Sequence, residues 1–193
     1  MKQRHSPLTP VKVALALTLG LVASLTLAPA LATGAIDEGN IENTVFIKDG
    51  KGGLRFVAPK SIYSGEELTV VNTTNAHKVG PHTFSLVTQS SIPKTAKERQ
   101  VCFTPKHICK AIASWHGVKG NGPVHKNPAK AGEPGWDTLG SVTEKGDSWF
   151  TGTKPEASFT QKVSAAGGTT IYFVCAIHPW MHGSIEVLTS AAG

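Results

Sequence analysis

Short runs of alternating apolar and polar residues fill the chain from residue 44 onward, apart from one long interval. A side-chain period of two predicts β-strands, and the Gly-, Pro- and Asn-rich stretches between the runs predict turns. Seven strands are predicted in this way: Thr44–Lys48, Leu54–Ala58, Glu67–Asn72, His82–Val87, Ala157–Val163, Thr170–Cys175 and Ser184–Leu188. This number of short strands predicts an all-β domain, a sandwich or barrel.

The interval from about residue 90 to 155 breaks the pattern and predicts an insertion with structure of its own, because structureless loops of that length are uncommon. Thr104 followed by Pro105 is typical of a helix N-cap and first helical residue. Four apolar residues then share one helical face: Ile108, Ala111, Ile112 and Trp115. The insertion is therefore expected to contain a short helix that ends near Gly117.

Aromatic residues and histidines also stand out in the insertion. The aromatic residues are expected to anchor it to the core, with a partner-binding surface as the alternative: Trp136, Trp149 and Phe150. The histidines lie nine residues apart, a spacing that matches no tight ligand motif: His107, His116 and His125. Solvated histidines are the simpler interpretation, and a second metal site is the alternative.

The N-terminus has the pattern of a secretory signal peptide over residues 1–32. A basic segment precedes the apolar run Val13–Leu27, and Ala30-Leu31-Ala32 resembles a cleavage site before Thr33. The alternative is an uncleaved membrane anchor, because no charged residue occurs between Val13 and Ile36. Either interpretation places residues 33–193, a single domain with the insertion at about 90–155, outside the cytoplasm.

Charge changes this picture little. The chain of 193 residues has a formal charge of +6, but three of its 19 Lys and Arg precede residue 33 and all 13 acids follow it, which leaves about +3. No basic run is interleaved with aromatic residues, so nucleic-acid binding has no support. The basic residues scattered over residues 94–130 favour an acidic redox partner, or simply form a solvated surface.

A soft ligand set lies between the last two predicted strands. Cys175, His178 and Met181 have Cys-x2-His-x2-Met spacing, and Met181 is the only methionine apart from Met1. A thiolate, an imidazole and a thioether suit copper, which accepts a His2Cys set with a weak axial Met. With Cys175 assigned to metal, the odd cysteine count leaves Cys102 and Cys109 for a disulfide.

The second imidazole is expected from His82. A strand alternates sides, so His82 shares a face with Phe84 and Leu86 and lies at the end of the core. His77 is the competing ligand, but it has no core-facing neighbours at strand spacing. Thr83 directly after His82 is expected to donate its N–H or its hydroxyl to the Cys175 sulfur.

The stretches Val70–Asn75, Pro81–Phe84 and Ile171–Gly183 resemble the ligand regions of the cupredoxins, the small blue copper proteins. The spacing is similar to that of amicyanin-like loops. This resemblance implies a Greek-key β-sandwich with one type 1 copper, held by His82, Cys175 and His178 with Met181 as axial ligand. It also implies that the His178 ring edge projects to the surface through an apolar patch, to which Trp180 would contribute.

The function implied is that of an exported monomeric electron carrier. A redox protein would dock near His178 and Trp180, within an electron-transfer chain that can be membrane-associated. A copper-dependent enzyme is the first alternative, although the His-x-His motifs of multicopper oxidases are absent. A copper-binding or delivery protein that uses the insertion is the second, and a secreted sandwich without metal would leave the Cys175 loop unexplained.

Overall fold

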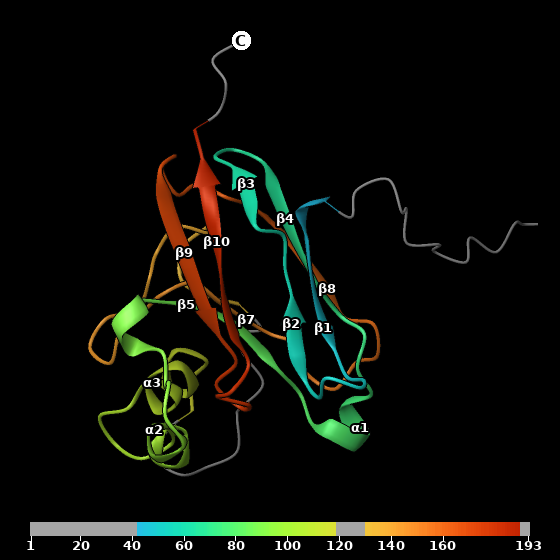
Figure 1. Ribbon diagram of the computed structural model, residues 1–193. Helices are drawn as coiled ribbons and strands as arrows, with labels where there is room; N and C mark the ends of the chain where they lie inside the picture. Colours follow the sequence, from blue (N-terminus) through green and yellow to red (C-terminus); the bar gives the residue numbers. More distant parts are fainter. Residues whose placement is uncertain (1–41, 119–129, 190–193) are drawn as a thin grey trace, which may run out of the picture. The chain divides into compact units, whose positions relative to one another are not determined.

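Two β-sheets form the described part of the chain, residues 42–118 and 130–189 of the computed structural model (Figure 1). The first sheet has the order β2-β1-β4-β8. Its strands are β1 (Thr44–Lys48), β2 (Arg55–Val57), β4 (Glu67–Asn72) and β8 (Ser158–Lys162). The second sheet has the order β3-β10-β9-β5-β7-β6. Its strands are β3 (Ser61–Tyr63), β5 (Thr83–Val87), β6 (Lys130–Ala131), β7 (Ser148–Phe150), β9 (Thr169–Val174) and β10 (His182–Leu188).

The seven predicted strands are all present, with ends within two residues of the prediction. Most neighbouring strands are antiparallel, but β1 pairs with β4, and β10 with β3, in parallel. The all-β, two-sheet fold class is confirmed. The predicted signal peptide and His125 lie outside the described residues.

The main core lies between the inner faces of the two sheets. Phe84 on β5 and Phe173 on β9 are fully buried there, with ring centroids 4.7 Å apart. Phe56 on β2 packs edge-on against both rings across the core, at 5.8 and 5.2 Å. Cys175 and Met181 belong to the same cluster, so the predicted ligand loop closes one end of the core.

The aromatic anchors of the insertion are confirmed for two tryptophans. Trp136 is fully buried, with its ring edge-on to Phe84 at 5.2 Å. Trp149 lies on β7, pairs with Phe84 in register and stacks on Phe159 at 5.9 Å. Phe150 is only half-buried. Through β7 the insertion becomes part of the six-stranded sheet.

Helix α3 (Ile108–Trp115) of the insertion packs on the outer face of this sheet, and helix α2 (Ala96–Val101), which buries no residue, precedes it (Figure 1). The predicted helix is confirmed in α3, but its N-cap is His107 and not Thr104. Thr104 instead closes the end of α2 by donating its hydroxyl to the Val101 carbonyl. Lys106 has φ of 69°, a conformation that interrupts a helix, so α3 begins after it.

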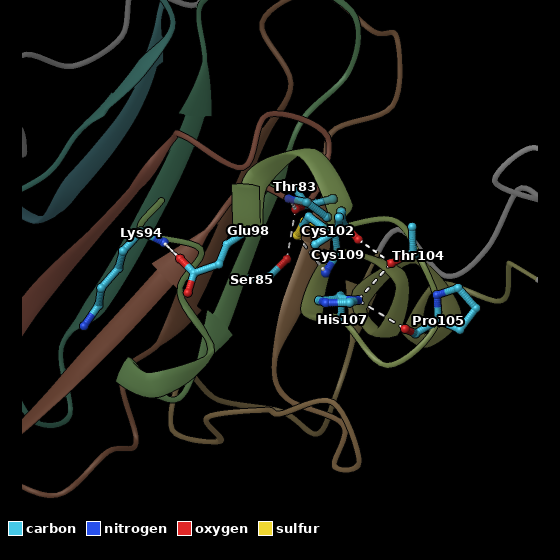
Figure 2. Close-up of a disulfide and its surroundings, with 11 residues drawn as sticks. Thr83, Ser85, Lys94, Glu98, Cys102, Thr104, Pro105, His107 and Cys109 are labelled. Atoms are coloured by element: carbon cyan, nitrogen blue, oxygen red, sulfur yellow. Dashed lines mark hydrogen bonds between the residues drawn. A yellow bond between two sulfur atoms is a disulfide. The ribbon is translucent and has the colours of Figure 1, made fainter. Parts of the chain in front are cut away.

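A disulfide joins the two helices, as Figure 2 shows. Cys102 is the C-cap of α2 and Cys109 lies in the first turn of α3, with their Cα atoms 5.1 Å apart. The predicted Cys102–Cys109 bridge is therefore confirmed. Both residues are buried in a second apolar cluster with Val87 of β5 and Val174 of β9.

The segment between β4 and β5, predicted to be a loop, contains the short helix α1 (Ala76–Val79). The side chain of Asn75 caps it by accepting from the His77 N–H at 3.0 Å. A single 3-10 turn, η2 (Gln89–Ser91), follows β5. None of the helices in the described part of the chain has the length and apolar character needed to cross a membrane.

Candidate metal centre

Three of the four predicted ligands converge at one end of the core. The Cys175 Sγ atom lies 3.9 Å from His82 Nδ1 and 3.8 Å from His178 Nδ1, and the two nitrogens are 3.1 Å apart. His82 and Cys175 are fully buried and His178 is 8% exposed. In residues 42–118 and 130–189 no other group of three or more His, Cys, Asp and Glu side chains has this geometry.

Strand pairing brings these residues together from positions 93 apart in the sequence. β5 and β9 are antiparallel neighbours, with Ser85 opposite Val174, so the start of β5 lies beside the end of β9. His82 immediately precedes β5 and Cys175 immediately follows β9. The loop to β10 is tight, because the Cys175 N–H donates to the Met181 carbonyl at 2.9 Å.

Met181 follows His178 in this loop, and its N–H donates to the His178 carbonyl at 2.8 Å. Its side chain is 1% exposed and packs in the main core. Its role as the axial ligand remains a prediction.

The competing histidines lie elsewhere. His77 is exposed on α1, and His182 is exposed at the start of β10. His107 hydrogen-bonds to Thr104 and His116 to Ser148. His82 is therefore the histidine that accompanies Cys175 and His178, as the strand pattern predicts.

A buried hydrogen-bond chain orients the His82 ring. Thr74 donates its hydroxyl to Asn72 Oδ1 at 2.8 Å, so the Thr74 oxygen accepts from His82 Nε2–H at 3.0 Å. This leaves His82 Nδ1 without a hydrogen on the side that faces Cys175. Thr74 was not predicted as part of the site, because its only signal in the sequence is its place in the polar run after β4.

The insertion holds the His82 backbone. Thr151, which directly follows β7, accepts from the His82 N–H with its hydroxyl at 3.0 Å. Its own N–H donates to the His82 carbonyl, also at 3.0 Å. The position of His82 thus depends on a residue 69 positions away, which no local pattern could indicate.

Thr83 contacts the Cys175 sulfur as the sequence predicts. Its N–H points at Cys175 Sγ with a nitrogen–sulfur distance of 3.4 Å. Burial raises the pKa of the Cys175 thiol, and the Thr83 N–H lowers it, together with the His178 and Ile177 backbone and the Thr83 hydroxyl. A buried thiol of this kind loses its proton when a metal ion takes the proton's place.

Both histidines are suited to act as neutral donors. Burial, reinforced by the neighbouring His178, lowers the pKa of His82 from 6.5 to about 4. Burial also lowers the pKa of His178, against a hydrogen bond to the Val79 backbone that raises it. The Val79 carbonyl is an acceptor, so the other ring nitrogen of His178, Nδ1, is left to face the sulfur.

Two imidazole nitrogens and one thiol sulfur therefore point into one buried space, and among the residues that the structure describes no acidic side chain joins them. Soft sulfur with imidazole ligands favours copper over magnesium, calcium or manganese. The donor set fits a type 1 copper site with one ion. The expected cupredoxin resemblance is thus supported by the ligand geometry.

The surface beside the site differs from the prediction. The His178 ring is buried, with only 8% of the residue exposed, and it hydrogen-bonds to the Val79 backbone. Trp180 is 51% exposed, as predicted, and its ring lies edge-on to that of His178 with centroids 5.1 Å apart. Trp180, and not His178, is the aromatic side chain that solvent reaches.

No protein-family model matches the sequence, and no curated protein matches it in a sequence comparison. The fold comparison finds blue copper proteins. Dithionite-reduced auracyanin from Roseiflexus castenholzii is 14% identical with a TM-score of 0.38, over 75% of this chain and 94% of that one. The "blue" copper protein auracyanin A from Chloroflexus aurantiacus is 14% identical with a TM-score of 0.37, over 75% and 95%. Auracyanin B is 12% identical with a TM-score of 0.38, over 75% and 86%. The copper assignment rests on the donor set and not on these similarities.

Proposed function

We propose that this protein is an exported electron carrier with one type 1 copper ion bound by His82, Cys175, His178 and Met181. The observation that supports the proposal is the convergence of two neutral imidazoles and one thiol in a buried space. When bound there, copper supplies a one-electron couple. The apolar, closed surroundings favour a carrier, because they leave little room for a substrate.

The contributions of the chain are rigidity and electrostatics. Thr74 fixes the His82 ring, Val79 fixes the His178 ring, and the β-sandwich fixes Cys175 at the end of β9. Donors held in place in this way change little between two oxidation states, which keeps the reorganisation cost of electron transfer low. Burial also excludes water from the donors.

The visible and EPR spectra of the protein with one equivalent of Cu(II) test this function. We expect an intense blue thiolate-to-copper band that is lost in Cys175→Ser and altered in His82→Ala. His77→Ala is the matched control, since His77 is the rival ligand but is exposed. A pale spectrum that does not respond to Cys175→Ser would contradict the proposal. Tight binding of a second copper would instead favour an enzyme.

Met181→Leu tests the fourth ligand. Leucine preserves the volume in the core, so the expected loss of stability is below about 1.5 kcal/mol. We expect a higher reduction potential, because loss of the thioether removes electron donation to the more highly charged Cu(II). An unchanged potential would remove Met181 from the ligand set.

The exposed Trp180 is our proposed contact for a redox partner. His182 nearby is exposed, but partial loss of water around its ring lowers its pKa, and the charges of Arg99 and Lys94 lower it further. This end of the protein therefore carries basic residues of the insertion. An apolar residue beside basic ones suits a small interface with an acidic protein.

Electron self-exchange between reduced and oxidised copies tests this docking face, because two such faces must meet. Trp180→Lys should slow self-exchange by adding like charge. Tyr63→Lys is the control, since Tyr63 is also exposed, at 45%, but pairs with Leu188 at the far end of β10. Equal rates in the two variants would refute docking at Trp180.

A further inference from the structure

A line of buried hydroxyl groups runs along the outer face of the six-stranded sheet, beneath α3. Ser85 Oγ on β5 lies 2.9 Å from Thr83 Oγ1 and 2.6 Å from Ser148 Oγ on β7. His116, the C-cap of α3, places its Nε2 atom 2.8 Å from the same Ser148 oxygen. All four side chains are at most 4% exposed. The hydrogen bond between Ser85 and Thr83 is drawn in Figure 2, close to the disulfide.

The direction of this chain follows from counting hydrogens, since each hydroxyl has one. Ser85 donates its hydrogen to Thr83, so it must accept at the Ser148 contact. Ser148 has then used its own hydrogen and must accept from His116 Nε2–H. Every donor therefore points the same way, from α3 towards β5.

The chain ends at Thr83, the residue next to the Cys175 sulfur. The Thr83 oxygen already accepts from Ser85 and from the Ala176 N–H, at 2.9 Å each, so its own hydrogen remains to be donated. The Thr83 N–H donates to the Cys175 sulfur at 3.4 Å, so the residue that ends the hydroxyl chain also contacts the proposed thiolate ligand. Hydrogen bonds in series polarise one another, so the chain acts on Thr83 as a unit.

We propose that His116 is a positioning residue for the copper thiolate, acting through the hydroxyls of Ser148, Ser85 and Thr83. The inference rests on the proposed copper site. His116 fixes the direction of the chain, and the chain holds Thr83, whose N–H donates to the Cys175 sulfur. The insertion thus adjusts the reduction potential of the copper site from the outer face of the six-stranded sheet.

The chain has a defined effect on the reduction potential. A donor to the thiolate withdraws negative charge, which stabilises the reduced, more electron-rich site relative to the oxidised one. Loss of one hydrogen bond is worth about 1 kcal/mol. Breaking the chain should therefore shift the Cu(II)/Cu(I) equilibrium about fivefold towards Cu(II), or about 43 mV for one electron, since a tenfold change corresponds to about 59 mV.

The test uses His116→Leu, Ser148→Ala and the double variant, each loaded with one equivalent of copper. We expect both single variants to lower the reduction potential and move the thiolate-to-copper band, and the double variant to add nothing, because the two residues act in series. Ser114→Ala is the matched control, since Ser114 also lies on α3 but is exposed and bonds only to the Lys110 carbonyl. Its potential should equal that of the unmodified protein. Unchanged potentials in folded variants, or additive shifts, would overturn the proposal.

A second measurement needs neither substitution nor copper. The 15N chemical shifts of the His116 ring in the unmodified, metal-free protein should show a hydrogen on Nε2. An unprotonated Nε2 would reverse the chain and overturn the proposal even if the variants failed to fold. Absence of a blue band in the unmodified protein would instead refute the copper site and leave the His116 result to stand separately.

Discussion

The hydrogen bond from His82 to Thr74 gives the sharpest prediction about the site. Thr74→Val keeps the shape of the side chain and removes only the hydroxyl. His82 is fully buried and Thr74 is 5% exposed, so water cannot replace the lost oxygen without a rearrangement. Asn72 Oδ1 keeps one donor, the Thr74 N–H at 3.1 Å. The cost falls on His82 Nε2–H, which loses its partner.

A buried donor without a partner costs about 1–3 kcal/mol, so we expect Thr74→Val to lower the free energy of unfolding of the metal-free protein by that amount. Urea denaturation near neutral pH measures it, since His82 with a pKa of about 4 is neutral there. The variant should also bind copper about 10–100-fold more weakly, because the ring of a metal-binding histidine is oriented by its second hydrogen bond. Competition with a copper chelator measures this affinity.

Thr73→Val is the matched control. The Thr73 hydroxyl donates to the Ile47 carbonyl at 2.9 Å, but that carbonyl also accepts the Thr73 N–H. Its loss should cost at most about 1 kcal/mol and leave copper affinity unchanged. The orienting role of Thr74 is refuted if the two variants lose copper affinity equally, or if Thr74→Val loses neither stability nor affinity.

Three further predictions concern the insertion. Burial raises the pKa of Asp147, so its carboxylate costs stability as the pH rises above the ordinary carboxyl pKa of about 4. Urea titrations should find Asp147→Asn gaining stability on the unmodified protein as the pH rises above that value, and a constant difference would contradict this. Replacing Cys102 and Cys109 together by Ser removes a disulfide between positions seven apart, and loop entropy predicts a loss of about 2.5 kcal/mol in the free energy of unfolding. Thermal unfolding should show a lower midpoint, and an unchanged midpoint would exclude a stabilising role for the bridge. Gly140→Ala would press the new Cβ into the Trp115 ring and should lower the free energy of unfolding by about 1–3 kcal/mol, measured by thermal unfolding. Gly50 is exposed, so Gly50→Ala is the control, and an equal loss of stability in the two variants would contradict this packing.

The strands could be predicted from the sequence because alternation is a local signal and both sheets bury one face. The missed strands β3, β6 and β7 have two or three residues, too few to show a period. Strands β3 and β7 form because the longer strands β10 and β5 pair with them, and β6 pairs in turn with β7. Helix α2 was missed because it buries no residue and so lacks an apolar face, although its capping box, Thr95 with Glu98, can be read in the sequence.

The candidate site, like the strands, was predictable only where its signals are local in the sequence. The spacing of Cys175, His178 and Met181 is local, and strand alternation distinguished His82 from His77. The burial of His178 was not predictable, because its hydrogen bond to the Val79 backbone joins residues about 100 positions apart in the sequence. The hydroxyl chain has no sequence signature either, since His116 and Ser148 meet only through tertiary packing.

Strand β5 lies between two cores, and all five of its residues are buried. Its inner face carries Phe84 and Leu86, and its outer face carries Val87 beneath the helices of the insertion. A shortened version without the insertion would expose Val87, Val174 and Ala176 to water and leave the Ser85 hydroxyl without Ser148. Any trimmed form of the protein made for biotechnology must therefore be redesigned on that face of the sheet, with polar outward residues on β5 and β9, before it can be expected to remain soluble.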